Sequence, residues 1–290
     1  MPDLAFDTAP LALTVHQGRA GDRNPRAMAG ARRLGEALTR RLGLETRTVG
    51  EPQEPLGLGW RAELDAAHGS LRQLATHCDT ALARGHRLLT VLNRCACALA
   101  TLPAVARHWP DARIVWFDAH ADSNTPETSS SGYLGGLVLT GAAGLWDSGL
   151  GAGLRLSQVV LVGARDIDPA EQALIDAGSL QFVPPGEDLV ERLRAAVGAH
   201  PVYVHLDCDV LEPGIVPTEY QVPGGLSLEQ LAAASKVLAA QELIGLEIAE
   251  FEANWPGSDL AAATDPLLDA LAPLLQGLGD VQQHRLANAS

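Results

Sequence analysis

Residues 114–122 read Ile-Val-Trp-Phe-Asp-Ala-His-Ala-Asp, an apolar run that ends in alternating polar residues. Side chains alternate along extended backbone, so Asp118, His120 and Asp122 are expected to point the same way beyond a strand over 114–117. Oxygen-rich sites with an imidazole suit Mn²⁺ or a similar divalent ion better than the thiolate sites typical of zinc. For this stretch alone, a turn rich in aspartate is the alternative.

A second segment shows the same pattern, because residues 204–209 read Val-His-Leu-Asp-Cys-Asp. Asp207 and Asp209 alternate on one side of the predicted strand, and adjacent carboxylates are costly unless a cation or a shared proton compensates them. A solvated turn is again the alternative. The two segments together offer four aspartates and one histidine, too many ligands for one ion. They predict a centre of two bridged ions, which makes water nucleophilic near neutral pH.

Short apolar runs alternate with longer segments of helical periodicity along the whole chain. Strands are expected at residues 11–15, 88–92, 114–117, 159–163, 180–183, 202–206 and 243–248, and helices at 26–42, 71–83, 98–108, 169–177, 189–197, 228–239 and 260–275. This alternation predicts an α/β fold, a three-layer α/β/α domain with a mostly parallel sheet. No linker divides the chain, so residues 1–290 are expected to form one domain. The glycine-rich residues 132–153 are expected to be the longest irregular region.

Composition and charge narrow the classes of protein. The chain has 290 residues, 47% apolar and 19% charged, so a substantial core is expected and disorder is not. Lys and Arg number 21 against 35 Asp and Glu, and the net charge of −14 repels phosphate backbones and anionic lipids. We therefore expect neither nucleic-acid nor membrane partners.

Targeting and cysteine patterns point to the cytoplasm. Apolar runs are far shorter than the ~20 residues of a membrane span, and residues 1–10 lack a signal-peptide pattern. The four cysteines, which include no Cys-x-x-Cys pair, predict no disulfide framework. Glycine-rich phosphate motifs are absent from the sequence, so nucleotide binding has no support.

Five segments together resemble the ureohydrolase family, which includes arginase, agmatinase and formimidoylglutamase. They are residues 118–126, 131–132, 162–169, 205–209 and 246–250. The resemblance covers most of the chain. It implies an arginase-like fold and hydrolysis of a guanidino C–N bond in a small guanidino amino acid, with two Mn²⁺ ions per chain. A homo-oligomer is compatible with it.

The resemblance also implies a role for each matching residue. The implied metal ligands are Asp118 and Asp207 as bridges, Asp122 on one ion, and His120 with Asp209 on the other. The implied catalytic carboxylates are Asp122 and Glu250, and Glu250 would pair with the planar guanidinium. The positions implied at the amino-acid end of the substrate are Asn124 and Ser131 for the α-carboxylate, and Asp168 and Glu171 for the α-amino group.

Two positions depart from the family pattern. Residues 93–97 read Asn-Arg-Cys-Ala-Cys where the family usually has Gly-Gly-Asp-His-Ser, whose histidine is a metal ligand. Cys95 takes the histidine position in one alignment, and Ala96 or Cys97 lies nearby in others. We expect Cys95 to be a ligand, although sulfur is a softer match for Mn²⁺; a small buried residue is the alternative. Gly135 stands where arginase carries a histidine that shuttles protons.

Cys95 and residues 133–136 also resemble a narrower actinobacterial group, linked to antibiotic biosynthesis, that hydrolyses Nω-hydroxy-L-arginine. The expected reaction gives L-ornithine and hydroxyurea; conversion of L-arginine to L-ornithine and urea is the other reading. A hypothesis from another class is a catalytically impaired relative that serves as a binding or regulatory subunit. Metal content separates the two, because only the enzyme needs two ions.

Overall fold

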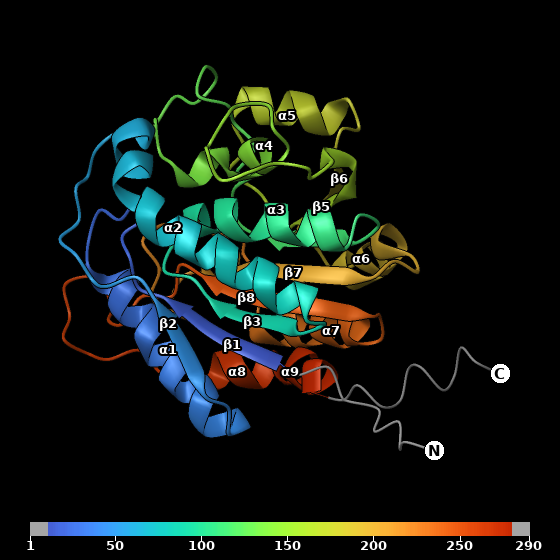
Figure 1. Ribbon diagram of the computed structural model, residues 1–290. Helices are drawn as coiled ribbons and strands as arrows, with labels where there is room; N and C mark the ends of the chain where they lie inside the picture. The colour runs from blue at the N-terminus through green and yellow to red at the C-terminus, as the bar shows by residue number, and fades with distance from the viewer. Residues whose placement is uncertain (1–10, 280–290) are drawn as a thin grey trace, which may run out of the picture.

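The computed structural model describes residues 11–279, whose strands form one eight-stranded sheet (Figure 1). The strands are β1 (Leu11–His16), β2 (Thr46–Val49), β3 (Arg87–Val91), β4 (Arg113–Phe117), β5 (Val159–Val162), β6 (Gln181–Val183), β7 (Val202–Asp207) and β8 (Leu243–Ala249). Their order is β2-β1-β3-β8-β7-β4-β5-β6, and each neighbouring pair is parallel. The predicted parallel sheet is therefore confirmed.

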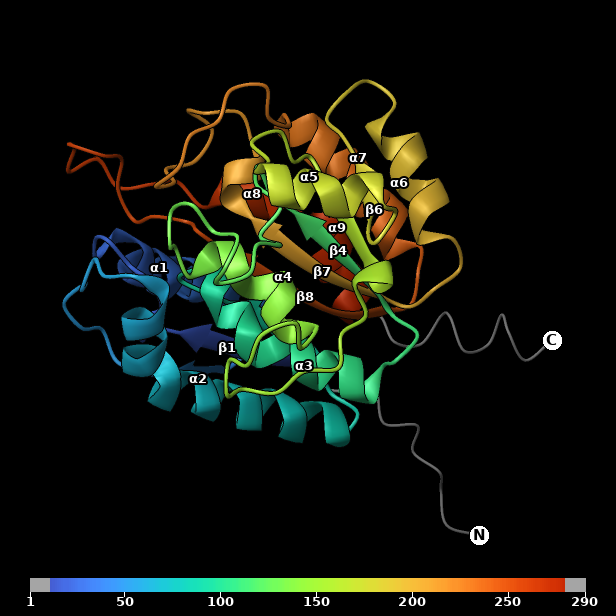
Figure 2. The same ribbon diagram turned by 90° about the horizontal axis from the view of Figure 1, so that it is seen from above.

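Helices cover both faces of this sheet, as Figures 1 and 2 show. They are α1 (Arg26–Leu42), α2 (Trp60–Ala83), α3 (Ala98–His108), α4 (Val138–Ala142), α5 (Pro169–Asp176), α6 (Leu189–Val197), α7 (Leu228–Ala239), α8 (Asp265–Ala270) and α9 (Ala272–Gly279). One apolar core joins α1 and α6–α9 to one face, and a second core joins α2–α4 to the other. Parallel strands are apolar on both sides and need such cover, so the three-layer α/β/α prediction is confirmed.

Strand β4 illustrates how the sequence fills both cores. Val115 and Phe117 belong to the core on the α1 side, whereas Ile114 and Trp116 belong to the core on the α3 side. Successive side chains of a strand point to opposite faces, so an unbroken apolar run is what a doubly covered strand requires. The run ends at Asp118, where the chain leaves the sheet.

The prediction of one helix over residues 260–275 is wrong in two respects: the helical segment begins later, at Asp265, and it is divided into two helices. The structure has two helices there, and Leu260 is 67% exposed instead of packed. Pro266 lies in the first turn of α8 and Pro273 is the second residue of α9. Proline has no backbone N–H to donate and favours a first turn, so it starts helices and interrupts longer ones.

Three further elements differ from the expectation. Helix α2 begins at Trp60, eleven residues before the expected start at residue 71. Strand β2 was not expected, because three of its four residues are exposed at the sheet edge and form no apolar run. The glycine-rich residues 132–153 contain the short buried helix α4.

Two expectations concern the chain as a whole. The single domain over residues 1–290 stays a prediction, since residues 1–10 and 280–290 lie outside the described residues. Within residues 11–279, each helix is too short or too polar to cross a membrane.

Helix α1 approaches the segment after β8 very closely at Gly30. A Cβ atom at Gly30 would lie 1.9 Å from the Phe251 carbonyl oxygen. The Ala253 N–H also donates to the Arg26 carbonyl over 3.0 Å. This contact fixes the chain directly after Glu250, a predicted catalytic residue.

We expect Gly30→Ala to lower the free energy of unfolding by about 2 kcal/mol or more, because backbone atoms must move to admit the methyl group. Gly69→Ala is the matched control. Gly69 is an exposed residue of α2, and a Cβ atom added there would meet no neighbouring atom within 4 Å. It should raise the free energy of unfolding by about 0.5–1 kcal/mol, since alanine favours helix more than glycine. Urea unfolding measures both. Equal effects of the two variants would refute the close contact.

Candidate metal centre

The predicted site residues gather at the carboxyl ends of four neighbouring strands. Cys95 follows β3, Asp118 follows β4, Asp207 ends β7 and Glu250 follows β8. These strands lie side by side in the order β3-β8-β7-β4. Open α/β sheets bind ligands outside the carboxyl ends of their strands, so the location itself is that of a ligand site.

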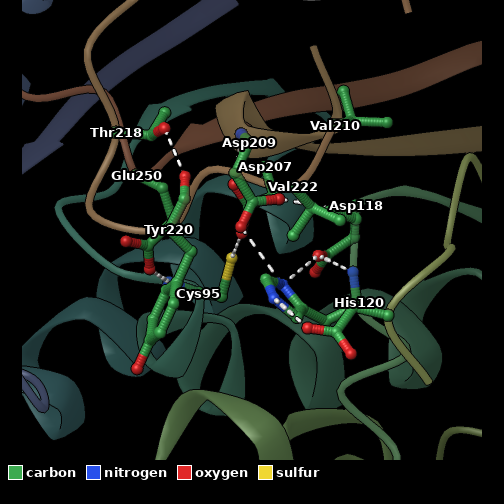
Figure 3. A network of polar contacts seen from close by, with 12 residues as sticks. Cys95, Asp118, His120, Asp207, Asp209, Val210, Thr218, Tyr220, Val222 and Glu250 are labelled. Atoms are coloured by element: carbon green, nitrogen blue, oxygen red, sulfur yellow. Dashed lines mark hydrogen bonds and ion pairs between the residues drawn. The ribbon is translucent and has the colours of Figure 1, made fainter. Parts of the chain in front are cut away.

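Candidate metal ligands form three overlapping groups, each with donor atoms within 4.8 Å of one another. The groups are Cys95 with Asp118 and Asp122, Cys95 with Asp207 and Glu250, and Asp118 with His120 and Asp209. Figure 3 shows Cys95 pointing toward Asp207, and His120 toward Asp118 and Asp209. Because the groups share members, they form one continuous set of donors. All six predicted ligands belong to it.

Hydrogen bonds hold the aspartates in this arrangement. Asp118 Oδ1 accepts the His120 backbone N–H over 2.7 Å, and Asp118 Oδ2 accepts the Trp116 indole N–H over 2.9 Å. Asp207 Oδ1 accepts the Asp209 N–H over 2.7 Å. The aspartates thus make turn contacts, as the alternative interpretation expected. They also converge, which a solvated turn does not require.

The charge balance of the cluster is strongly acidic. Burial, Asp209 and Asp118 raise the pKa of Asp207 well above its usual range, and burial and Asp118 do the same for Asp122. Burial would lower the pKa of His120, but Asp118 and Asp209 outweigh it and raise the pKa to about 12. One imidazolium compensates only part of this negative charge. Buried oxygen donors with one imidazole and one thiol fit divalent cations.

The loop after β3 directs one of its two cysteines toward the aspartates. Cys95 Sγ lies 3.0 Å from Asp207 Oδ2 and is buried. Cys97 Sγ instead lies 3.2 Å from His16 Nδ1 and 3.3 Å from Asn93 Oδ1. Of the alternatives that the sequence left open, Cys95 is therefore the one that faces the cluster.

A buried polar chain supports Cys95 from behind. His205 Nε2 lies 3.1 Å from Cys95 Sγ, and His205 Nδ1 lies 2.7 Å from Glu247 Oε1. The His205 ring stacks on Trp116 with centroids 3.5 Å apart. Glu247 pairs with His205 across neighbouring strands β8 and β7. By strand alternation His205 lies on the same side of β7 as Asp207, whereas no local pattern indicates its contact with Glu247.

A pocket opens over the cluster and contains the residues predicted for the amino-acid end of the substrate. These residues are Asn124, Ser131, Asp168 and Glu171. Asn124 donates to Asp168 over 2.9 Å. Glu171 accepts the backbone N–H groups of Ser123 and Asp168 with its two carboxylate oxygens. The bond from the Asp168 N–H is one half of a capping box at the start of α5, which favours a structural role for Glu171.

An aromatic ring fills the space beside Gly135. A Cβ atom there would lie 2.5 Å from Tyr133 Cε1, so an imidazole at this position requires Tyr133 to move. Tyr133 and Tyr220 both line the pocket, with ring centroids 5.7 Å apart. The lack of a histidine at Gly135 is visible in the sequence, whereas the ring that occupies its place is visible only in the structure.

Two site carboxylates have strained backbone. Asp122 has φ 46° and Glu250 has φ 63°, and they are the non-glycine residues with positive φ within residues 11–279. Such conformations cost roughly 1–3 kcal/mol and persist only where the surroundings enforce them. Neither residue type signals this in the sequence. The strain falls on both carboxylates that the sequence assigned to catalysis.

The main residue that sequence reasoning missed is Arg94. Its side chain is fully buried, and its Nη1 lies 2.7 Å from Glu250 Oε2. The same guanidinium also contacts Asp22 over 3.0 Å and Glu219 over 2.6 Å. A buried arginine needs several carboxylates, and these come from segments far apart in the chain.

Comparisons with known proteins agree on one family. A sequence model of the arginase family matches residues 3–264. Nω-hydroxy-L-arginine amidinohydrolase of Streptomyces lavendulae is 43% identical over 261 residues, which cover 90% of this chain and 96% of that protein. Arginase of Eremothecium gossypii is 32% identical over 234 residues, 74% of this chain and 56% of that protein. The structure of Entamoeba histolytica arginase in complex with L-ornithine matches with a TM-score of 0.79 at 22% identity, covering 92% and 97% of the two chains.

We expect Asp207→Asn to separate metal binding from folding. Without metal, the variant should unfold at the same or a higher temperature than wild type, because a buried acid is removed and an amide oxygen can still accept the Asp209 N–H. Mn²⁺ at about 100 times its Kd should stabilise wild type by about 2.7 kcal/mol and the variant by much less. Thermal unfolding with and without Mn²⁺ measures this, with exposed Asp176→Asn as control. Equal stabilisation of wild type and Asp207→Asn would show that the carboxylate holds no ion.

Proposed function

Because this chain belongs to the arginase family, whose enzymes hydrolyse guanidino groups, we propose Nω-hydroxy-L-arginine as its substrate and L-ornithine and hydroxyurea as its products. The observation that carries the reaction is the set of four buried aspartates and buried Cys95, together with the partly buried His120, beside Glu250. The closeness to the Streptomyces amidinohydrolase supports the substrate.

We propose that the cluster holds two Mn²⁺ ions, in a family that depends on a binuclear metal centre. The proposed ligands of one ion are Cys95, Asp118, Asp122 and Asp207, and those of the other are Asp118, Asp207, His120 and Asp209. The bound ions would lower the pKa of water and polarise the guanidino group. The acidity of the buried cluster supports this assignment.

The remaining pocket residues orient the substrate in this proposal. Glu250 would accept hydrogen bonds from the guanidino nitrogens, for which a carboxylate is the matching planar partner. Asn124 and Ser131 would bind the α-carboxylate and Asp168 the α-amino group, while Glu171 holds the loop. Water adds to the guanidino carbon, the bond from that carbon to the ornithine nitrogen breaks, and the departing amine takes a proton.

A catalytically impaired binding subunit finds less support. Gly135 and the cysteine in place of a histidine motivated that hypothesis. The full donor set nevertheless lies together, with Cys95 and the four aspartates buried, at an energetic cost that a binding protein without metal has no reason to retain.

Cys95 variants test the proposed thiol ligand. Cys95→Ser should weaken the affinity for one of two Mn²⁺ ions by roughly 10–100-fold or more, and Cys95→His should restore or tighten it, because imidazole is the better ligand for Mn²⁺. Cys97→Ser is the matched control, since its sulfur is also buried but faces His16. Metal content after dialysis at graded free Mn²⁺ measures the effect. Unchanged affinity in both Cys95 variants would mean that Cys95 only packs.

A comparison of three substrates tests the specificity. General acid help contributes roughly 10²–10⁴-fold, and Gly135 cannot transfer a proton to the leaving amine. An N-hydroxyguanidine is less basic and more electrophilic than a guanidinium, so it tolerates this loss better. We expect kcat/KM to be highest for Nω-hydroxy-L-arginine, lower for L-arginine, and lowest for agmatine, which lacks the α-carboxylate. Arginine ahead of hydroxyarginine would make the chain an ordinary arginase, and agmatine ahead of both would invalidate the roles of Asn124, Ser131 and Asp168.

A further inference from the structure

The protein carries a guanidinium of its own at the carboxylate proposed to bind the substrate guanidine. Arg94 is fully buried and directs three nitrogens at three carboxylates. Its Nη1 lies 2.7 Å from Glu250, its Nε 3.0 Å from Asp22, and its Nη2 2.6 Å from Glu219. An arginine side chain stays protonated in proteins, so the cation is permanent.

One short loop contacts both oxygens of Glu250. Arg94 donates to Oε2, and the backbone N–H of the next residue, Cys95, donates to Oε1 over 2.8 Å. The Glu250 backbone has φ 63°, a conformation that needs outside support. Glu250 also lines the pocket. Its carboxylate is therefore oriented before any substrate enters.

The surroundings keep Arg94 in place. Asp22 is buried and also accepts the Asn93 amide and the Ala20 N–H, each over 2.8 Å. Glu252 lies 3.7 Å from Arg94 and is bound to Arg26 over 2.6 Å. Arg94 is thus held by a buried ionic network from several sides.

A fixed cation on Glu250 affects cationic and neutral ligands differently. The guanidinium of L-arginine is always charged and would bring a second positive charge next to Arg94. The two positive charges, both next to Glu250, repel each other, and burial strengthens this repulsion because the surroundings screen it less than water does. An N-hydroxyguanidine is less basic, and its neutral form keeps N–H donors for Glu250 without this repulsion.

We propose that Arg94 is a positioning and specificity residue, which orients Glu250 and disfavours a cationic guanidinium relative to a less basic N-hydroxyguanidine. This inference rests on the proposed function. It is independent of the Gly135 argument, because it concerns the charge of the bound substrate and not the proton given to the leaving amine.

Two Arg94 variants separate charge from orientation. Arg94→Lys keeps the cation but loses the planar fork. We therefore expect kcat to fall about tenfold for both Nω-hydroxy-L-arginine and L-arginine. The ratio of the kcat/KM values for these two substrates should stay within about threefold of the wild-type ratio. Arg94→Gln combined with Asp22→Asn removes one charge of each sign, and should shift that ratio at least tenfold toward L-arginine. Circular dichroism and metal content establish that each variant is folded and loaded. A folded, loaded double variant with the wild-type ratio would overturn the proposal.

A milder variant covers the case in which the double variant does not fold. Glu219 is partly exposed, with 14% of its side chain accessible, and its Oε2 lies 2.6 Å from Arg94 Nη2, where it offsets part of the Arg94 charge. Glu219→Gln should therefore shift the ratio about threefold or more toward Nω-hydroxy-L-arginine. An unchanged ratio in this variant would also overturn the proposal.

Arg26→Gln is the matched control, because Arg26 belongs to the same network but contacts Glu252 instead of Glu250. The ratio of kcat/KM for the two substrates should stay within about twofold of the wild-type ratio in this variant. A shift as large as that of the double variant would show that the total charge of the network, and not Arg94, sets the substrate preference. Failure of the proposed function looks different, because it is seen in wild type itself: with two bound metals it would prefer L-arginine or hydrolyse neither substrate.

Discussion

Four aspartates buried at the ends of β4 and β7 repel one another, and the surrounding residues must offset that repulsion. Asp118, Asp122, Asp207 and Asp209 are buried together, and a sheet of parallel strands brings them there because all its carboxyl ends lie at one edge. His120 offsets part of the charge. The remaining excess favours divalent cations, in keeping with a family that depends on two metal ions.

The loop over residues 93–97 connects this cluster to a second acidic group. Cys95 contributes a thiol to the aspartates, while its neighbour Arg94 supplies the cation for Asp22, Glu219 and Glu250. Glu250 lies between the two groups and makes hydrogen bonds to both loop residues. The departure from the usual glycine-histidine loop of the family therefore changes two things together, a donor atom and the charge environment of Glu250.

Local patterns predicted much of the fold. The helices α1, α3, α6 and α7 have the bounds that periodicity indicated, and seven of the eight strands lie within one or two residues of their expected positions. The misses have local physical causes. Strand β2 is an exposed edge strand without an apolar run, and Pro273 divides the expected last helix. Glu171 matched a family position, but its oxygens cap a helix.

Strand periodicity and motif spacing are local properties. The sequence alone therefore sufficed to predict the parallel α/β class, the aspartates and His120 at the strand ends, and the loop that lacks a histidine. The position of β8 and β7 between β3 and β4, by contrast, emerges only from the folded chain. The β3–β8 neighbourhood brings Arg94 to Glu250, 156 residues later, and the fold of the loop after β3 places Cys95 rather than Cys97 against Asp207. Such contacts depend on packing and charge compensation between distant segments, for which no local pattern exists.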